Sequence, residues 1–320
     1  MSKEDKYNEI RSIIGEASMR PIQARLKHVK DNDLDFAHYT SAETAFKIIK
    51  NKSLLLRNSQ LMNDYSEIRR GLRAVELGFG GSDPASGSFW HDAKSIYPKI
   101  KDKFHQVLHH KSVSLLEDTY IACLSEFSTK QSLGKLSMWR AYGYPNGVAL
   151  IIDQNAIASA AMTVDITTYP VIYTEPGTTI SNTLSLAIEE INKVVHIFKD
   201  YDEEDLVDVL VKLALHYATC IKDSNFSEEV EWRAVYQPAI YDFEVTKFES
   251  QVLGGTPQIV RKLDLGDNSS IRLTDILKKV VIGPTEYPEI SRKAFVKLLK
   301  DEKFEYPELK VEIARIPFRG

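Results

Sequence analysis

The order of strand-like and helix-like segments constrains this fold more than any other feature of the sequence. Short runs rich in β-branched and aromatic residues predict strands, whereas apolar residues at intervals of three and four predict helices. The expected helices cluster between some strands, without the regular strand–helix alternation of a doubly wound sheet. We therefore expect an α+β fold with mostly antiparallel sheets. Strands are expected at 34–40, 53–59, 118–126, 146–153, 163–174, 225–236, 278–284 and 309–317.

Outside the strands, the sequence predicts one main domain with two helical additions. Residues 1–30 predict an N-terminal helical segment with a break at Pro21. Residues 31–320 are expected to form a single domain, with two amphipathic helices in an insertion at about 178–224. Gly, Ser and Pro replace the periodicity over residues 78–88, which predicts a surface loop.

Two helix starts within the main domain have capping patterns. Thr40 followed by Glu43 forms a capping box after the first strand. Asp64 with Glu67 predicts another capped helix after the second strand.

Composition argues against several classes of protein. The chain has 320 residues and a formal net charge of −4, so it lacks the global basic field of a general nucleic-acid binder. The charged N-terminal residues differ from a secretory signal, and no apolar run approaches the roughly 18–20 residues of a membrane span. The two cysteines, Cys123 and Cys220, lack metal-ligand spacing. We therefore expect a cytoplasmic protein with no membrane association.

Charged and apolar residues alternate in the segment 225–236, which is an expected strand. This alternation places Glu229, Glu231 and Arg233 on one face of the strand. A solvated face of a sheet accounts for this pattern. Alternatively, both carboxylates face a cleft, where they accept hydrogen bonds from a ribose hydroxyl or stabilise a cationic, sugar-like transition state.

Polar residues at the ends of the first two strands are further candidates. His38 and Thr40 precede a helix N-terminus, where anionic ligands are recognised, although a lone histidine at a strand end is more often a packing residue. Arg57 and Asn58 end the second strand. Asn63 is accounted for by a turn before the next helix.

Ser137, Trp139 and Tyr142 precede a glycine-rich turn and an apolar strand. They indicate either a core tryptophan beside a hairpin turn or an aromatic wall for a planar ring. No metal site is expected, because the histidines and their acidic neighbours lack ligand spacing. The phosphate-binding and nucleophile motifs based on glycine-rich loops are absent from the sequence.

Taken in order, five segments resemble a large, mostly uncharacterised bacterial domain family of unknown function. They are "HYTS", "LRNSQLMNDYSE", "CLSEF", "SMWRAYG" with "GVAL", and "FSEEVEWRAVY". That family is in turn similar to the ADP-ribosyltransferase fold, which includes toxins that modify nucleic acid. The resemblance covers most of residues 33–285 and implies a split β-sandwich, flanked by helices, that holds NAD in a cleft.

The resemblance also implies roles for individual residues. His38, with Thr40 beside it, is the first-strand residue that binds ribose, and Glu231 is the catalytic carboxylate. Glu229 orients the acceptor or takes its proton. The aromatic wall comes from Tyr39, Trp139 or Tyr142, and the stacking tyrosine is not uniquely assigned. The remaining residues expected at the cofactor site are Arg57, Asn63 and Ser137.

The expected activity is transfer of ADP-ribose from NAD to a macromolecule by a toxin or phage-defence effector. The toxin-like kinship favours nucleic acid as acceptor and the acidic net charge favours protein. NAD is the substrate, and an antitoxin or immunity protein is an expected partner. The alternatives are an NAD glycohydrolase, a non-catalytic module that binds a nucleotide or a partner, and a nuclease using Glu229, Glu231 and a histidine. The nuclease lacks a clear metal set.

Overall fold

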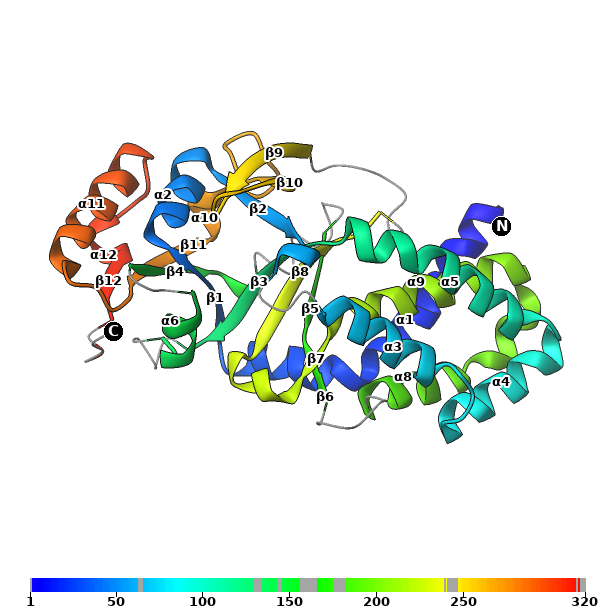
Figure 1. The fold of residues 1–320 in the computed structure, drawn as a ribbon. Helices are drawn as coiled ribbons and strands as arrows, with labels where there is room; N and C mark the ends of the chain where they lie inside the picture. The colour runs from blue at the N-terminus through cyan, green and yellow to red at the C-terminus, as the bar shows by residue number, and fades with distance from the viewer. Residues whose placement is uncertain are drawn as a thin grey trace.

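A sheet stands beside a bundle of long helices in the computed structural model (Figure 1). The structure describes residues 2–62, 66–128, 134–142, 146–155, 166–174, 182–238, 240, 247–314 and 316. Among these residues, no helix combines the length and apolar character needed to cross a membrane.

The main sheet of the described chain has ten strands, and all their pairings are antiparallel except that of β11 with β12. This arrangement confirms the expected α+β class with mostly antiparallel strands. A second sheet pairs β6 (Ile172–Thr174) with β7 (Ile221–Asp223). The strands of the main sheet are β1 (Asp35–Ser41), β2 (Ser53–Asn58), β3 (Tyr120–Phe127), β4 (Gly147–Ile152), β5 (Thr167–Pro170), β8 (Glu231–Tyr236), β9 (Lys247–Leu253), β10 (Thr256–Asp264), β11 (Leu277–Ile282) and β12 (Val311–Ile313).

The main sheet splits along one edge of β3. The end of β3 near Phe127 pairs with β1, whereas its beginning, at Tyr120 and Ile121, pairs with β2. The residues between, 122–124, have no strand partner on that edge within the described chain, while β8 pairs along the opposite edge. β1 and β2 therefore separate from each other beside the middle of β3.

The helical bundle gathers segments that lie far apart in the sequence. α9 lies at its centre and packs against α1, α3 and α5, and α8 packs against α1 and α4. The N-terminal helix and the two helices of the expected insertion thus share one apolar core. The bundle consists of α1 (Lys3–Asp31), α3 (Glu67–Gly78), α4 (Pro84–Ile96), α5 (Ile100–Asp118), α8 (Asn182–Asn192) and α9 (Glu203–Cys220).

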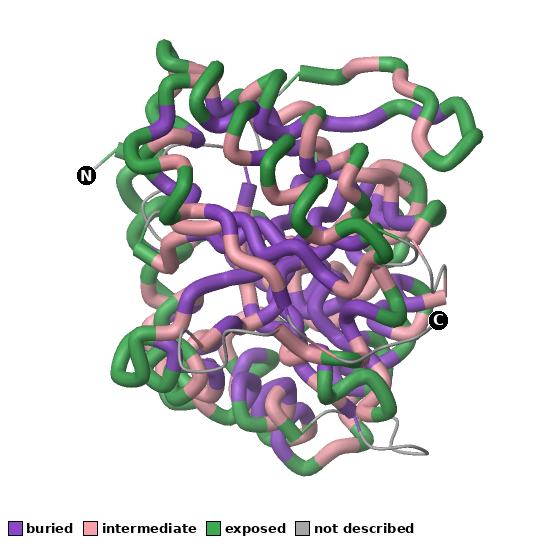
Figure 2. Tube along the Cα trace, turned by 90° about the vertical axis from the view of Figure 1, so that its left-hand side faces the viewer, coloured by how far each residue is buried: buried purple, intermediate pink, exposed green. Residues whose placement is uncertain are grey.

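A second core lies between the main sheet and the helices α2 and α11, where the rings of Phe46 and Phe295 meet edge-on at 4.7 Å. Buried residues concentrate along the strands and on the inward faces of the helices (Figure 2). The remaining short elements are α2 (Ala42–Asn51), η1 (Ser59–Leu61), α6 (Leu136–Tyr142), η2 (Val195–Asp200), η3 (Ser224–Glu229), α10 (Leu273–Ile276), α11 (Pro288–Asp301) and α12 (Pro307–Lys310).

Three local expectations were wrong. α1 continues through Pro21, because buried residues on both sides, Ile14 and Ile22 among them, pack on the bundle. The expected loop at 78–88 is shorter, because Asp83 caps α4 and Pro84 occupies its first position. The cap of α2 is Ser41, whose hydroxyl accepts a hydrogen bond from the Thr44 amide at 3.2 Å, and not Thr40.

Two further differences concern strands. The expected strand at 163–174 contains two separate strands, β5 and β6, which end and begin around Val171. The β9–β10 hairpin was not expected. Its turn, Gly254–Gly255, has positive φ at both residues, which is the conformation that a tight two-residue hairpin requires.

The contact between α3 and α9 depends on the absence of a side chain at position 71. A Cβ atom at Gly71 would lie 1.9 Å from the carbonyl oxygen of Ala218, whereas a Cβ at Gly15 in α1 would meet nothing within 4 Å. We expect Gly71→Ala to lower the free energy of unfolding by about 1–3 kcal/mol or more, because backbone must move to admit the methyl group. Denaturant unfolding monitored by circular dichroism measures this change.

Gly15→Ala is the matched control, and it should raise the free energy of unfolding by about 0.5–1 kcal/mol, because alanine favours the helix. Equal stability of the Gly71→Ala variant and the wild type would contradict the close α3–α9 packing.

Candidate functional site

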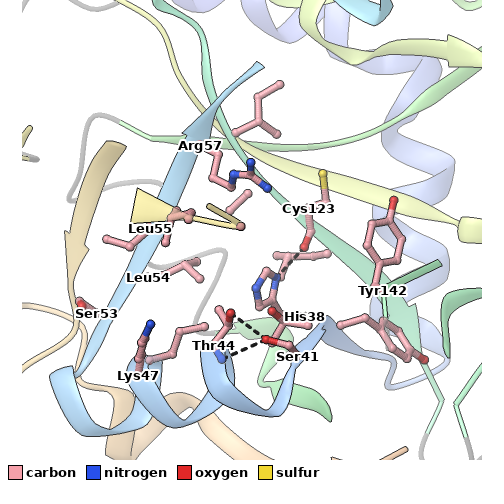
Figure 3. Close-up of a pocket in the computed structure, with 18 of the residues that line it drawn as sticks. His38, Ser41, Thr44, Lys47, Ser53, Leu54, Leu55, Arg57, Cys123 and Tyr142 are labelled. Carbon is pink, nitrogen blue, oxygen red and sulfur yellow. Dashed lines mark hydrogen bonds between the residues drawn. The ribbon is translucent and has the colours of Figure 1, made fainter. Parts of the chain in front are cut away.

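A cleft of about 620 Å³ opens where β1 and β2 separate, a volume typical of small-molecule sites. β1, β2 and the middle of β3 line it together with α2, α6 and the β9–β10 hairpin. His38 lies in its middle, with Lys47 on one side and Tyr142 on the other (Figure 3). Side chains from both halves of the split sheet therefore face one space.

The cleft brings together most of the expected site residues, although they come from four separate parts of the chain. Ser137 and Trp139 are not among the lining residues, and Asn63 lies outside the described residues. The expected residues that do line the cleft are His38, Tyr39, Thr40, Arg57, Tyr142, Glu229 and Glu231.

Trp139 packs behind the cleft instead of forming its wall. Its side chain is buried, and its ring meets the ring of Tyr39 edge-on at 4.9 Å. A Cβ atom at Gly283 would lie 2.5 Å from the indole. Of the three aromatic residues considered for the wall, Tyr39 and Tyr142 line the cleft.

His38 satisfies a backbone group that the split leaves without a strand neighbour. Its Nδ1 donates a hydrogen bond of 2.9 Å to the carbonyl oxygen of Cys123, in the middle of β3. Because a carbonyl only accepts, the proton lies on Nδ1, and Nε2 is left as an acceptor. Burial lowers the pKa of His38, so its ring is neutral near pH 7. His38 thus offers the cleft a fixed hydrogen-bond acceptor.

The segment before β8 differs from the expected continuous strand. Residues Ser224–Glu229 form a 3₁₀ turn, Val230 has φ 45° and ψ 52°, and the strand begins only at Glu231. A left-handed conformation is unusual for a β-branched residue and costs on the order of 1–3 kcal/mol. The interpretation as a solvated sheet face was wrong: Glu229, Glu231 and Arg233 are 8%, 3% and 1% exposed.

Lys222 of β7 holds the two expected catalytic carboxylates together. Its Nζ donates to Glu229 Oε2 and to Glu231 Oε2, at 2.7 Å in each case. It also lies 3.2 Å from Glu67 Oε1 on α3. The three N–H donors of one ammonium group therefore face three carboxylates.

Arg233 completes this buried ion cluster from the other side. Its Nε donates to Glu231 Oε1 at 2.8 Å, its Nη1 donates to the Thr219 carbonyl at 2.8 Å, and its Nη2 donates to Glu67. The cluster, defined as Glu67, Lys222, Glu229, Glu231 and Arg233, has three carboxylates and two cations. A buried site with surplus carboxylate favours a cationic ligand or a proton.

The cluster shifts the pKa values of Glu229 and Glu231 in opposite directions. Burial opposes ionisation of Glu231, but the charges of Arg233 and Lys222 outweigh it and lower the pKa of Glu231 to about 2. For Glu229, burial is the larger influence and raises the pKa above its ordinary value despite the hydrogen bond from Lys222. Glu231 therefore stays ionised, whereas Glu229 is the carboxyl that can take up and release a proton.

The backbone around Glu231 is also fixed. The hydroxyl of Tyr173 accepts a hydrogen bond from the Glu231 amide at 2.9 Å. Arg25 of α1 donates to the Val171 carbonyl at 2.7 Å and to Glu126 at 3.0 Å, next to β8. The helical bundle therefore holds the start of β8 through side chains of α1 and α3.

The opposite side of the cleft is basic. Lys47 on α2, Lys262 on β10 and Arg57 on β2 line it, together with the carboxylates of Glu43 and Glu249. Lys47 pairs with Glu43 and Lys262 with Glu249, but both pairs are partly or fully exposed. Since exposed pairs contribute at most about 1 kcal/mol, an anionic ligand can exchange with these carboxylates at small cost.

Sequence reasoning missed Glu67 and Lys222. Glu67 was expected to cap α3, yet it is buried and binds Arg233 and Lys222. The sequence did contain a signal for both residues. Buried carboxylates on an otherwise apolar strand need charged partners from elsewhere in the chain.

Among the described residues, no group of histidine, cysteine and acidic side chains has the arrangement of a metal site.

Residues 138–234 match a family model described as "protein of unknown function (DUF2971)". The matched region includes Tyr142, Lys222, both cleft glutamates and Arg233, and it ends within β8. This match confirms the resemblance to an uncharacterised domain family. No curated protein and no solved structure matches the chain, so the further resemblance to ADP-ribosyltransferases has no support from relatives.

The ion cluster predicts a pH-dependent loss of stability when Arg233 is replaced. Arg233→Met leaves Glu67 and Glu231 without their guanidinium, and removal of one partner of a buried pair costs about 3–5 kcal/mol near neutral pH. The stability that Glu231 contributes is present above its unfolded pKa and is lost as pH falls toward its folded pKa of about 2. Without Arg233 the carboxyl accepts a proton more easily, so the destabilisation should be smaller at pH 4 than at pH 7.5. Urea unfolding at both pH values measures it.

Arg70→Met is the control, because the Arg70–Asp223 pair next to the cluster is partly exposed. That variant should lose at most about 1 kcal/mol. Equal losses in the two variants, or a loss for Arg233→Met that does not change with pH, would contradict a compact buried cluster.

Proposed function

We propose that the cleft binds NAD and transfers its ADP-ribosyl group to a macromolecule. The observation that carries this proposal is the polarity of the cleft, with a surplus of buried carboxylate at one side and basic side chains at the other. NAD has the complementary polarity, because its nicotinamide ring is cationic and its diphosphate is anionic. The cleft volume of about 620 Å³ is also that of a site for a molecule of drug size.

The basic side accounts for diphosphate binding. Lys47 and Lys262 supply mobile ammonium groups and Arg57 a planar guanidinium, which suits phosphate oxygens. The N-terminus of α2, capped by Ser41, adds favourable dipoles for an anion nearby.

The acidic side accounts for the chemistry. In the proposed reaction the bond between C1′ of ribose and the nicotinamide nitrogen breaks, and nicotinamide leaves as a neutral molecule with the bonding electrons. The ribose passes through an oxocarbenium-like cation. Glu231, held ionised by Arg233 and Lys222, stabilises that cation and accepts a hydrogen bond from a ribose hydroxyl. The acceptor then forms the new bond to C1′.

Glu229 and His38 have separate roles in this proposal. Glu229, the carboxyl with the raised pKa, takes the proton that the acceptor loses. His38 accepts a hydrogen bond from the substrate at its free Nε2 and remains neutral. Tyr142, whose pKa is raised by burial, lies beside the carboxylates and packs against the nicotinamide ring.

Glu231→Gln tests the proposal with NAD labelled in the adenylate phosphate, incubated with a cell lysate. Loss of the anion should reduce labelling of macromolecules at least about 100-fold, which is the usual effect of removing one group that stabilises a transition-state charge. Digestion of the product with protease or nuclease, in separate samples, identifies whether protein or nucleic acid carries the label.

Two further variants separate loss of chemistry from loss of substrate binding. Lys47→Ala, on the exposed basic side, should raise the KM for NAD several-fold and leave kcat nearly unchanged. Glu190→Gln, on α8 away from the cleft, should keep wild-type activity. Labelling by Glu231→Gln at the wild-type rate would remove Glu231 from catalysis. Release of nicotinamide without labelling of any macromolecule would instead identify an NAD glycohydrolase. If the wild type does not turn over NAD at all, both activities are contradicted.

A further inference from the structure

The outer edge of β9 combines an open strand edge with exposed apolar side chains. β9 ends the main path of the sheet, so its outer edge has no strand partner in the part of the chain that the structure describes. Phe248 and Val252 on β9 are 45% and 63% exposed, and Ile259 on β10 is 54% exposed. The hairpin lies at the margin of the sheet (Figure 1). Open apolar edges of this kind favour association with another strand.

The geometry of the hairpin determines which backbone groups face outward. A two-residue turn closes on a hydrogen-bonded pair, here Leu253 and Thr256, and bonded and non-bonded pairs then alternate along the ladder. Val252 therefore belongs to a non-bonded pair with Pro257, which agrees with the missing N–H of proline. It follows that the N–H and C=O groups of Phe248, Ser250 and Val252 point to the open edge.

We propose that two copies of this chain associate by antiparallel pairing of their β9 edges, centred on Ser250. In this register Ser250 lies opposite Ser250 of the second copy, and Phe248 lies opposite Val252 of the second copy. All three pairs formed by these residues use outward-pointing backbone groups. On the other face, Glu249 lies opposite Gln251 of the second copy, so a carboxylate meets an amide donor.

Neighbouring registers are less favourable. Centring the pairing on Glu249 would place two carboxylates directly opposite each other, which is destabilising. Centring it on Gln251 would place Phe248 opposite Gly254 and Val252 opposite Ser250, and the apolar contacts would be lost. The strand is therefore complementary to itself in one register.

β9 has the charged residues Lys247 and Glu249, but it lacks two other features that protect edge strands from pairing. It has no proline, and its register with β10 runs without a bulge from Lys247 to Leu253. A contact of one strand with another buries less than a standard interface of about 1,600 Å². The dimer is therefore weak and depends on concentration.

Dimerisation would affect the cleft, because the inner face of β9 forms part of its wall. Glu249, Gln251, Val252 and Leu253 line the cleft. Pairing with a second strand would fix the hairpin between two neighbours and place two clefts along one continuous sheet. The pairing of two β9 edges requires none of the chemistry proposed for the cleft.

Sedimentation velocity over a series of concentrations tests the proposal, using the wild type and three variants. Ser250→Pro removes an outward N–H without removing a bond to β10, and Val252→Lys places a charge in the apolar pair. We expect the wild type to shift from monomer to dimer as concentration rises, and both variants to remain monomeric. Ile290→Lys, at an apolar residue of α11 that is 67% exposed, should dimerise as the wild type does.

Circular dichroism and thermal unfolding of each variant establish that the fold is retained. A wild-type chain that stays monomeric up to its solubility limit would overturn the proposal. So would a dimer that persists in folded Ser250→Pro and Val252→Lys, or one that Ile290→Lys abolishes.

Discussion

The interaction on which the rest of the site depends is the double pairing of Glu231 with Lys222 and Arg233. These three residues and Glu67 come from α3, β7 and β8, so the cluster joins the helical bundle to the sheet. Burial of so many charges is costly unless every one has a partner. The hydrogen bonds of the cluster therefore fix the positions of α3 and β8 relative to each other, and with them the carboxylates that face the cleft.

The cleft itself results from the split in the sheet. Beside residues 122–124, β3 has no strand neighbour on one edge within the described chain, and His38 binds the carbonyl of Cys123 there. The separation of β1 from β2 leaves this carbonyl to the His38 side chain, and it also provides the space for a ligand. His38 therefore has a structural role and also presents a polar atom to the cleft. The packing interpretation and the binding interpretation of this residue are compatible.

Much of the fold could be predicted because alternation and helical periodicity are local properties. The strands containing His38, Cys123 and Val148 were expected within a few residues of their observed bounds. The hairpin at β9–β10 was missed although its Gly-Gly turn is a strong signal. The turn at Val230 could not be predicted, because a β-branched residue disfavours the left-handed conformation that it adopts.

The candidate site was predictable only in part. His38 and Glu231 were expected to share one site, because the order of the motifs resembles that of a known domain family. Both residues line the cleft. Two members of the ion cluster were not expected, because Glu67 follows Asp64 at the spacing of a helix cap and Lys222 ends a helical pattern. Their pairing joins positions more than 150 residues apart, as the Glu67–Lys222 contact shows, and only the tertiary fold reveals it.

The ion cluster keeps one cleft carboxylate ionised, while the other retains a proton more readily. Carbon-13 NMR of glutamate side-chain carboxyls, assigned with Glu229→Gln and Glu231→Gln, measures both titrations in the folded chain. We expect Glu231 to titrate near pH 2, or to remain ionised to the acid limit of the fold, and Glu229 to titrate above its ordinary pKa. Titration of both groups together near the ordinary pKa of glutamate would contradict these opposite shifts.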